Sequence, residues 1–259
     1  MKVRMNITYP DGTHYPGKRN FQPWIDFLQF NDLDLSNQKV LDIATDEGWW
    51  AFWSEQKGAD YVEASDVERG EDYDWGAEKD WNWIDSLNQM RNAKTVFDFH
   101  HANLNSAVAY KKQSVYYITG EFDMVFCHGL IYHLRHPLLA IDKISNVTTG
   151  CAVIETHVDT ELQQDMAYSK FYRTTELQDT ISNWTGASVA CYTSWMKDAG
   201  FDHVYFSNKP FWARDAKCRR RFFVGTKTQE YKKRFDQNPN FVYCNDEYWK
   251  KVFKNNSYN

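Results

Sequence analysis

Titratable side chains crowd the stretch that follows one strongly apolar segment. The segment reads FDMVFC at residues 122–127, and five titratable side chains follow it within nine positions: His128, Tyr132, His133, Arg135 and His136. Histidine exchanges a proton most readily near neutral pH, and an aromatic ring attracts a cation that lies over its face. We therefore expect residues 128–136 to line a functional site rather than to fill the core.

Hydrophobic patterning predicts the elements that hold this site. Buried strands are predicted at residues 39–44, 61–67, 108–116, 122–127, 151–158, 203–209 and 219–227. Helices are predicted at residues 48–58, 80–92, 97–105, 136–148 and 187–201. Strands that alternate with helices indicate an α/β fold, with a Rossmann-like, doubly wound, mostly parallel sheet of seven strands. No helix separates the last two strands, so we expect an antiparallel hairpin at the C-terminal edge.

Ligands of such a sheet bind beyond the carboxyl ends of its strands. The first strand ends in VLDIATDEGWW, residues 40–50, where Gly48 permits close approach of the backbone to a ligand. The turn lacks the GxGxxG pattern of a pyrophosphate site, which favours a ligand carrying an amino acid and a nucleoside. Asp66 ends the second strand, where its carboxylate can accept both ribose hydroxyls. A loop cap is the alternative role of Asp66.

Composition narrows the class of protein further. The 259 residues carry a formal net charge of -5, so no global basic field is expected to hold a nucleic-acid backbone. The five cysteines are far apart and form no CxxC pair, which argues against a disulfide framework or a zinc site. We find no membrane-spanning run or signal peptide and expect a cytoplasmic protein. We divide the chain into an N-terminal entry or lid segment (1–38), a main domain (39–227) and a C-terminal extension packed on it (228–259).

Two segments resemble a known superfamily. Residues 39–67, KVLDIATDEGWWAFWSEQKGADYVEASDV, resemble the first two motifs of class I S-adenosylmethionine-dependent methyltransferases. Residues 121–158, EFDMVFCHGLIYHLRHPLLAIDKISNVTTGCAVIETHV, resemble the branch related to the tRNA wobble-uridine (5-oxyacetic acid and 5-methoxyuridine) methyltransferases. Residues 9–17 and 183–201 are similar to the entry loop and late helix of that branch. The likeness spans about residues 9–227.

The resemblance implies S-adenosylmethionine as cofactor, with S-adenosylhomocysteine as the product. The cofactor-binding residues that it implies are Asp42, Ala44, Asp46, Gly48, Asp66, Ser114, Val115, His128 and Gly129. Of these, Asp66 would hold the ribose, and Ser114 and Val115 would lie beside the adenine. Ala44 stands where the family usually has a glycine, and Tyr117 stands where relatives often carry an acid.

Methyl transfer to oxygen needs aligned reactants and a proton acceptor. We expect His133 to take the proton, with His128 as second choice, and Tyr132 to face the sulfonium. Each histidine has the alternative role of bonding to backbone or capping the strand end. Further aromatic candidates are Trp49 and Trp184, and the expected substrate-binding residues are Arg135, Glu155, His157 and Trp184. The histidine spacing favours no metal site.

The sequence leaves three functions open. The first is methyl transfer to an O or N atom of a small molecule, which the acidic balance favours. The second is RNA modification, which the resemblance and the CRRRF segment (218–222) favour, although alternation along an edge strand would leave these arginines in solvent. The third is cofactor binding without methyl transfer. Some relatives use a carboxylated cofactor, and the sequence does not locate the cations for one.

Overall fold

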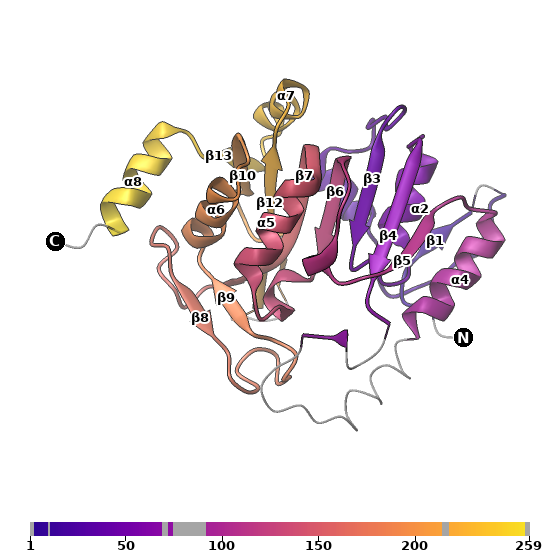
Figure 1. Cartoon of the computed structure of the whole chain (residues 1–259), viewed down its shortest axis with the longest axis horizontal. Helices are drawn as coiled ribbons and strands as arrows, with labels where there is room; N and C mark the ends of the chain where they lie inside the picture. The colour runs from indigo at the N-terminus through magenta and orange to yellow at the C-terminus, as the bar shows by residue number, and fades with distance from the viewer. Residues whose placement is uncertain (1–2, 10, 69–71, 75–91, 214–217, 257–259) are drawn as a thin grey trace. The chain divides into compact units, whose positions relative to one another are not determined.

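The computed structural model describes residues 3–9, 11–68, 72–74, 92–213 and 218–256 (Figure 1). Two compact units make up the chain: residues 1–72 with 80–114, and residues 73–79 with 115–259. The helix predicted at residues 80–92 falls almost wholly outside the described residues. None of the helices in the described ranges has the length and apolar character needed to cross a membrane.

The first unit contains a parallel three-stranded arrangement. Its strands are β3 (Lys39–Ile43), β4 (Tyr61–Asp66) and β5 (Ala109–Lys112), and β4 pairs in parallel with both others. Its helices are α1 (Gln22–Leu28), α2 (Trp49–Gln56) and α4 (Ala93–Leu104), and a small hairpin joins β1 (Ile7–Thr8) to β2 (His14–Tyr15). Parallel neighbours need a crossover, and α2 supplies it between β3 and β4. The carboxyl ends of these two strands therefore lie at the same edge.

The second unit combines parallel and antiparallel pairs. Its main strands are β6 (Phe122–His128), β7 (Thr148–Asp159), β10 (His203–Ser207), β12 (Cys218–Thr226) and β13 (Phe241–Tyr243). β6 and β7 are parallel, β12 is antiparallel to both β7 and β10, and β13 is antiparallel to β10. The predicted antiparallel hairpin is thus confirmed. The expectation of a solvent-exposed edge at the CRRRF segment (218–222) is wrong, because this part of β12 pairs with β7 on one side and with β11 on the other.

Helices and short strands complete the second unit. They are η2 (Val115–Tyr117), η3 (Ile131–His133), α5 (Pro137–Val147), β8 (Ser169–Phe171), β9 (Thr185–Ala187), α6 (Val189–Asp198), β11 (Trp212–Ala213), α7 (Gln229–Gln237) and α8 (Asp246–Asn256). α5 and α6 lie side by side against the strands of this unit (Figure 1). Pro137 opens α5, where its missing N–H and fixed φ are tolerated. α5 links β6 to β7 and so produces their parallel pairing.

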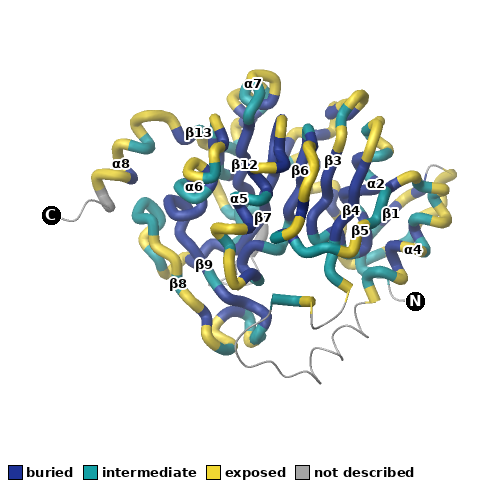
Figure 2. Tube along the Cα trace, viewed as in Figure 1, coloured by how far each residue is buried: buried dark blue, intermediate teal, exposed yellow. Residues whose placement is uncertain are grey.

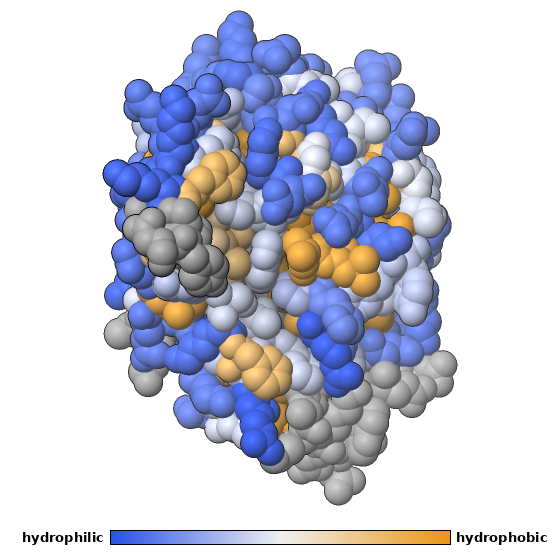
Figure 3. All heavy atoms as spheres, turned by 60° about the vertical axis from the view of Figure 1, so that its left-hand side comes forward, coloured by the Kyte–Doolittle hydropathy of each residue, from blue (hydrophilic) through white to orange (hydrophobic). Residues whose placement is uncertain are grey.

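Burial follows the strands in both units. All seven predicted strands are present among the described residues, and Figure 2 shows β6 and β7 buried along most of their length. β7 is buried at every position from residue 150 to 159, as expected of a strand covered on both faces. On the face seen in Figure 3, hydrophilic atoms dominate and hydrophobic atoms form separate small patches. The predicted α/β class, mostly parallel with an antiparallel hairpin, is confirmed.

Candidate functional site

The turn after β3 has an unusual backbone. Ala44, Asp46 and Gly48 all have positive φ, at 55°, 56° and 91°. Gly48 is required for a second reason, since a Cβ there would lie 2.5 Å from the Phe52 ring and 2.6 Å from the Phe97 ring. The glycine therefore lets α2 begin directly against α4. The two other residues carry side chains in a conformation that favours glycine.

Ala44→Gly is expected to raise the free energy of unfolding by about 0.5–1 kcal/mol. Glycine removes the steric penalty of a positive φ, and its greater freedom in the unfolded chain offsets part of the gain. Urea denaturation measures the change. Ala51→Gly in α2 is the matched control and should lose about 1 kcal/mol, because glycine weakens a helix interior. A comparable loss in both variants would contradict the strain at Ala44.

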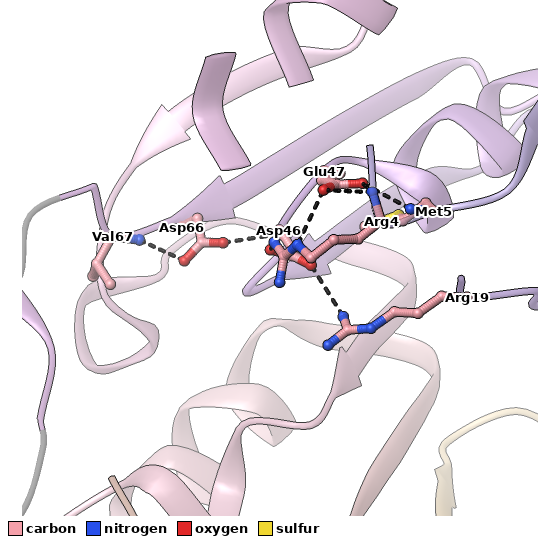
Figure 4. A network of polar contacts seen from close by, with 7 residues as sticks. All are labelled: Arg4, Met5, Arg19, Asp46, Glu47, Asp66 and Val67. Carbon is pink, nitrogen blue, oxygen red and sulfur yellow. Dashed lines mark hydrogen bonds and ion pairs between the residues drawn. The ribbon is translucent and has the colours of Figure 1, made fainter. Parts of the chain in front are cut away.

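Two backbone amides fix the Asp66 carboxylate at the end of β4. The amide of Asp46 donates to Oδ2 and the amide of Val67 donates to Oδ1, each at 2.8 Å (Figure 4). Asp46 comes from the turn after β3, so the first of these bonds joins the ends of two neighbouring strands. The arrangement presents a carboxylate of fixed orientation where a ribose is expected.

Asp46 and Glu47 bind arginines from the N-terminal residues. Arg4 pairs with both carboxylates, and Arg19 Nη1 lies 3.1 Å from Asp46 Oδ2. Glu47 is buried and accepts from the backbone amides of Arg4 and Met5, each at 2.9 Å to Oε2 (Figure 4). Sequence reasoning did not find these arginines, because nothing in the local pattern links them to a turn more than 25 residues away.

Asp42 is a buried acid beneath the same turn. Its carboxylate accepts a hydrogen bond from Thr45 Oγ1 at 2.6 Å and has 3% of its surface exposed. Burial, and then the nearby charge of Asp66, raises the pKa of Asp42 to about 7. The group therefore changes its charge near neutral pH.

In the second unit, the end of β6 contacts a buried ion pair. The amide of Gly129 donates to the carbonyl oxygen of Glu155 at 2.8 Å, and the φ of Gly129 is 73°. A Cβ at Gly129 would lie 2.7 Å from Arg220 Nη2. Arg220 in turn forms an ion pair with the fully buried carboxylate of Glu155. Glycine is thus needed at position 129 to let the guanidinium approach the strand end.

Arg220 also shapes the surroundings of two predicted catalytic residues. Its guanidinium lies over the Tyr132 ring, 5.3 Å from the centroid. Burial and then the charge of Arg220 lower the pKa of His128 to about 3, so His128 is neutral at pH 7. A nitrogen with so low a pKa is a weak base, which favours His133 over His128 as proton acceptor.

His133 has a defined tautomer. Its Nδ1 lies 2.7 Å from the carbonyl oxygen of Ser182, and a carbonyl can only accept. Nδ1 therefore carries a proton, and in the neutral ring Nε2 has the lone pair. The imidazole lies beside the Tyr132 ring, with centroids 4.1 Å apart. This is the tautomer that a proton acceptor at Nε2 requires.

The structure brings Arg135 and Trp184 together around Asp74. The Arg135 guanidinium lies over the Trp184 ring at 4.5 Å, and the Trp184 indole donates to the Asp74 carbonyl oxygen. The Asp74 carboxylate accepts from the Arg135 amide at 2.5 Å and from the Tyr116 hydroxyl at 2.6 Å. Two of the four predicted substrate-binding residues, Arg135 and Trp184, thus contact Asp74.

A second buried polar chain contains His157. The Tyr172 hydroxyl donates to Asp159 Oδ2 at 2.8 Å, and His157 Nε2 lies 3.0 Å from the same hydroxyl. Since the hydroxyl proton is directed to Asp159, His157 Nε2 must be the donor. Glu155 and His157 each have 0% of their surface exposed, so they support the strand end from the interior.

The predicted site residues therefore fall into two groups. The first unit holds Asp42, Ala44, Asp46, Gly48, Asp66 and Ser114. The second unit holds Val115, His128, Gly129, Tyr132, His133, Arg135, Glu155, His157 and Trp184. Trp49 donates from Nε1 to the Asn6 carbonyl oxygen at 3.0 Å and packs against Phe21. In the described part of the chain, no cluster of three or more His, Cys, Asp or Glu is arranged to hold a metal ion.

The chain has the fold of the class I S-adenosylmethionine-dependent methyltransferases. It superposes on the N-terminal domain of EvdMO1, crystallised in the presence of S-adenosylhomocysteine and D-fucose, with a TM-score of 0.55 and 16% identity, over 86% of this chain and 90% of that domain. A putative S-adenosylmethionine-dependent methyltransferase from Listeria monocytogenes gives a TM-score of 0.54 and 12% identity, over 81% of this chain and 100% of that one.

A larger enzyme also contains this fold. Haemonchus contortus phosphoethanolamine N-methyltransferase 2, in complex with phosphomonomethylethanolamine and S-adenosylhomocysteine, gives a TM-score of 0.57 and 14% identity. The match covers 80% of this chain and 53% of that chain, so this chain spans about half the length of that enzyme. No protein-family profile and no curated protein matches the chain.

Proposed function

We propose that the protein is an S-adenosylmethionine-dependent methyltransferase that moves a methyl group to an O or N atom of a small molecule. The observation that carries the proposal is the pair of strand ends in the first unit, where two amides fix the Asp66 carboxylate beside a turn of positive φ. Carboxylates favour a cofactor with hydroxyl donors and a positive charge. The fold supports the proposal, because neighbours of the same fold were crystallised with S-adenosylhomocysteine.

The proposed site residues would have separate roles. In the first unit, Asp66 accepts from the ribose hydroxyls, and the turn at residues 44–48 approaches the methionine part. Asp42 contributes a negative charge beneath the turn once it is ionised, which favours the cationic cofactor. In the second unit, Tyr132 and His133 receive the acceptor.

His133 is the proposed proton acceptor. The bound cofactor supplies an electrophilic methyl carbon on a sulfonium that leaves as a neutral thioether. When the acceptor oxygen takes up the methyl group and the sulfur keeps the electron pair of its broken bond, His133 Nε2 would accept the hydroxyl proton. The bond from Nδ1 to the Ser182 carbonyl selects the neutral tautomer whose lone pair is on Nε2, and it orients the ring.

We infer the class of acceptor from the net charge of the chain and from the ligands named for proteins of similar fold. The net charge of -5 disfavours a polyanion, and the ligands named for the neighbours include a sugar and a phosphorylated amine. RNA is the second candidate, because residues 121–158 resemble the wobble-uridine branch. Arg220, the central residue of the CRRRF segment, gives less support to RNA as the acceptor, since its guanidinium is paired with Glu155.

Transfer of a radiolabelled methyl group tests the proposal. The protein is incubated with labelled S-adenosylmethionine and panels of hydroxylated and amine-bearing small molecules, and separately with unmodified tRNA. His133→Gln should reduce transfer about 100-fold or more while leaving S-adenosylhomocysteine binding intact. His136→Gln, at an exposed histidine in the same stretch, is the control and should keep the rate.

The outcomes separate the candidates. Label in small molecules supports the proposal, and label only in tRNA would replace it with RNA modification. Cofactor binding without a labelled product in any panel would favour a protein that binds the cofactor without methyl transfer. An unchanged rate in His133→Gln would remove the assigned proton acceptor.

A further inference from the structure

Two N-terminal segments of the first unit run close together and are joined by backbone hydrogen bonds. The Asn6 amide donates to the Arg19 carbonyl oxygen, and the Arg19 amide donates to the Arg4 carbonyl oxygen, each at 2.8 Å. Gly17 makes this spacing possible, since a Cβ there would lie 2.2 Å from the Met5 carbonyl carbon. We call residues 3–9 and 11–19 the N-terminal strap.

The strap binds two acids, Asp46 and Glu47, in the turn between β3 and α2. Arg4 bonds to Glu47 through its backbone amide and through Nε at 3.0 Å, and it also pairs with Asp46. The Glu47 side chain is fully buried, and burial of a carboxylate is costly unless donors surround it. Arg19 adds a second cation at Asp46, at 3.1 Å. The strap therefore neutralises two acids of this turn.

Asp46 links the strap to the Asp66 carboxylate, which we propose binds the cofactor. Its side chain bonds to the strap, while its amide donates to Asp66 Oδ2 at 2.8 Å (Figure 4). Its φ of 56° is unfavourable for a residue with a side chain, so the surrounding contacts must hold it there. If the side chain lost its arginines, the turn would relax toward negative φ and the amide would turn away from Asp66.

We propose that Arg4 and Arg19 are positioning residues for cofactor binding, acting through Asp46 on the Asp66 carboxylate. This inference rests on the proposed function. It makes these two arginines of the strap part of the cofactor site, although neither needs to touch the ligand. A strap that only anchors the N-terminus would leave cofactor affinity unchanged when its ion pairs are removed.

Calorimetric titration with S-adenosylhomocysteine tests the inference. The variant Arg4→Gln/Arg19→Gln should raise the Kd about 10-fold or more, whereas Lys18→Gln, at an exposed cation of the strap, should leave it unchanged. Thermal unfolding shows whether each variant is folded. An unchanged Kd in the folded double variant would overturn the inference.

Two substitutions at Asp46 separate positioning from simple anchoring. Both Asp46→Ala and Asp46→Gly remove the carboxylate, but glycine adopts a positive φ without strain and alanine does not. We expect Asp46→Gly to bind S-adenosylhomocysteine within a few-fold of wild type and Asp46→Ala to bind about 10-fold more weakly. Equal affinities would overturn the positioning role. If the wild type itself does not bind the ligand, the proposed function fails instead.

Discussion

Arg220→Met is expected to lower the free energy of unfolding by about 3 kcal/mol or more at pH 8. The substitution leaves the Glu155 carboxylate, which has 0% of its surface exposed, without its cation. The loss should shrink at pH 5, because the unpaired carboxylate can then take up a proton. Urea denaturation of both proteins at the two pH values measures it.

A second substitution tests the cause of that loss. In Arg220→Met/Glu155→Gln neither charge of this ion pair remains, so stability at pH 8 should return to within about 1–2 kcal/mol of wild type. Arg219→Met is the matched control, because neighbouring residues of a strand point to opposite faces. A double variant as unstable as Arg220→Met would show that lost packing over Tyr132, rather than an unpaired charge, explains the effect.

Asp42→Asn is expected to change how stability depends on pH. The native pKa of about 7 lies above the ordinary value of 3.8, so the native state binds more protons than the unfolded state between these values. The wild type therefore loses stability as pH rises through this window, and the loss levels off above pH 7. From pH 5 to pH 8 this group alone removes about 2.5 kcal/mol.

The asparagine variant lacks this loss. Relative to wild type, its free energy of unfolding should improve by about 2.5 kcal/mol between pH 5 and pH 8, whatever constant change it shows. Urea denaturation without cofactor measures the comparison, and Asp98→Asn on the exposed face of α4 serves as control. Parallel pH dependences in wild type and Asp42→Asn would contradict a raised pKa at Asp42.

Local sequence patterns were enough to predict the carboxyl ends of β3, β4 and β6 to within one residue, whereas the strand predicted at residues 108–116 ends at Lys112. An apolar run followed by polar residues marked the end of β6, and Pro137 marked the start of α5. The juxtaposition of Asp46 and Asp66 follows from parallel pairing, which places the ends of β3 and β4 at one edge. These features depend on neighbours along the chain or on a single crossover.

Contacts between residues far apart in the sequence could not be predicted from local patterns. Alternation along the strand does not say which residue lies beside Arg220, because its contact with Glu155 depends on the register of β12 against β7. β13 was missed because three residues carry too little periodicity to predict a strand. Tyr172 reaches Asp159 only because Gly186 leaves room, as a Cβ there would lie 2.2 Å from the hydroxyl.

Binding of S-adenosylhomocysteine and S-adenosylmethionine to the purified protein is the most direct test of the cofactor site. Isothermal titration calorimetry with wild type and Asp66→Ala gives the comparison, and Asp72→Ala, an exposed acid paired with Lys112, is the control. We predict that wild type and Asp72→Ala bind both ligands and that Asp66→Ala weakens both about 100-fold. Absence of binding to wild type, or equal affinity in Asp66→Ala, would contradict the proposed site.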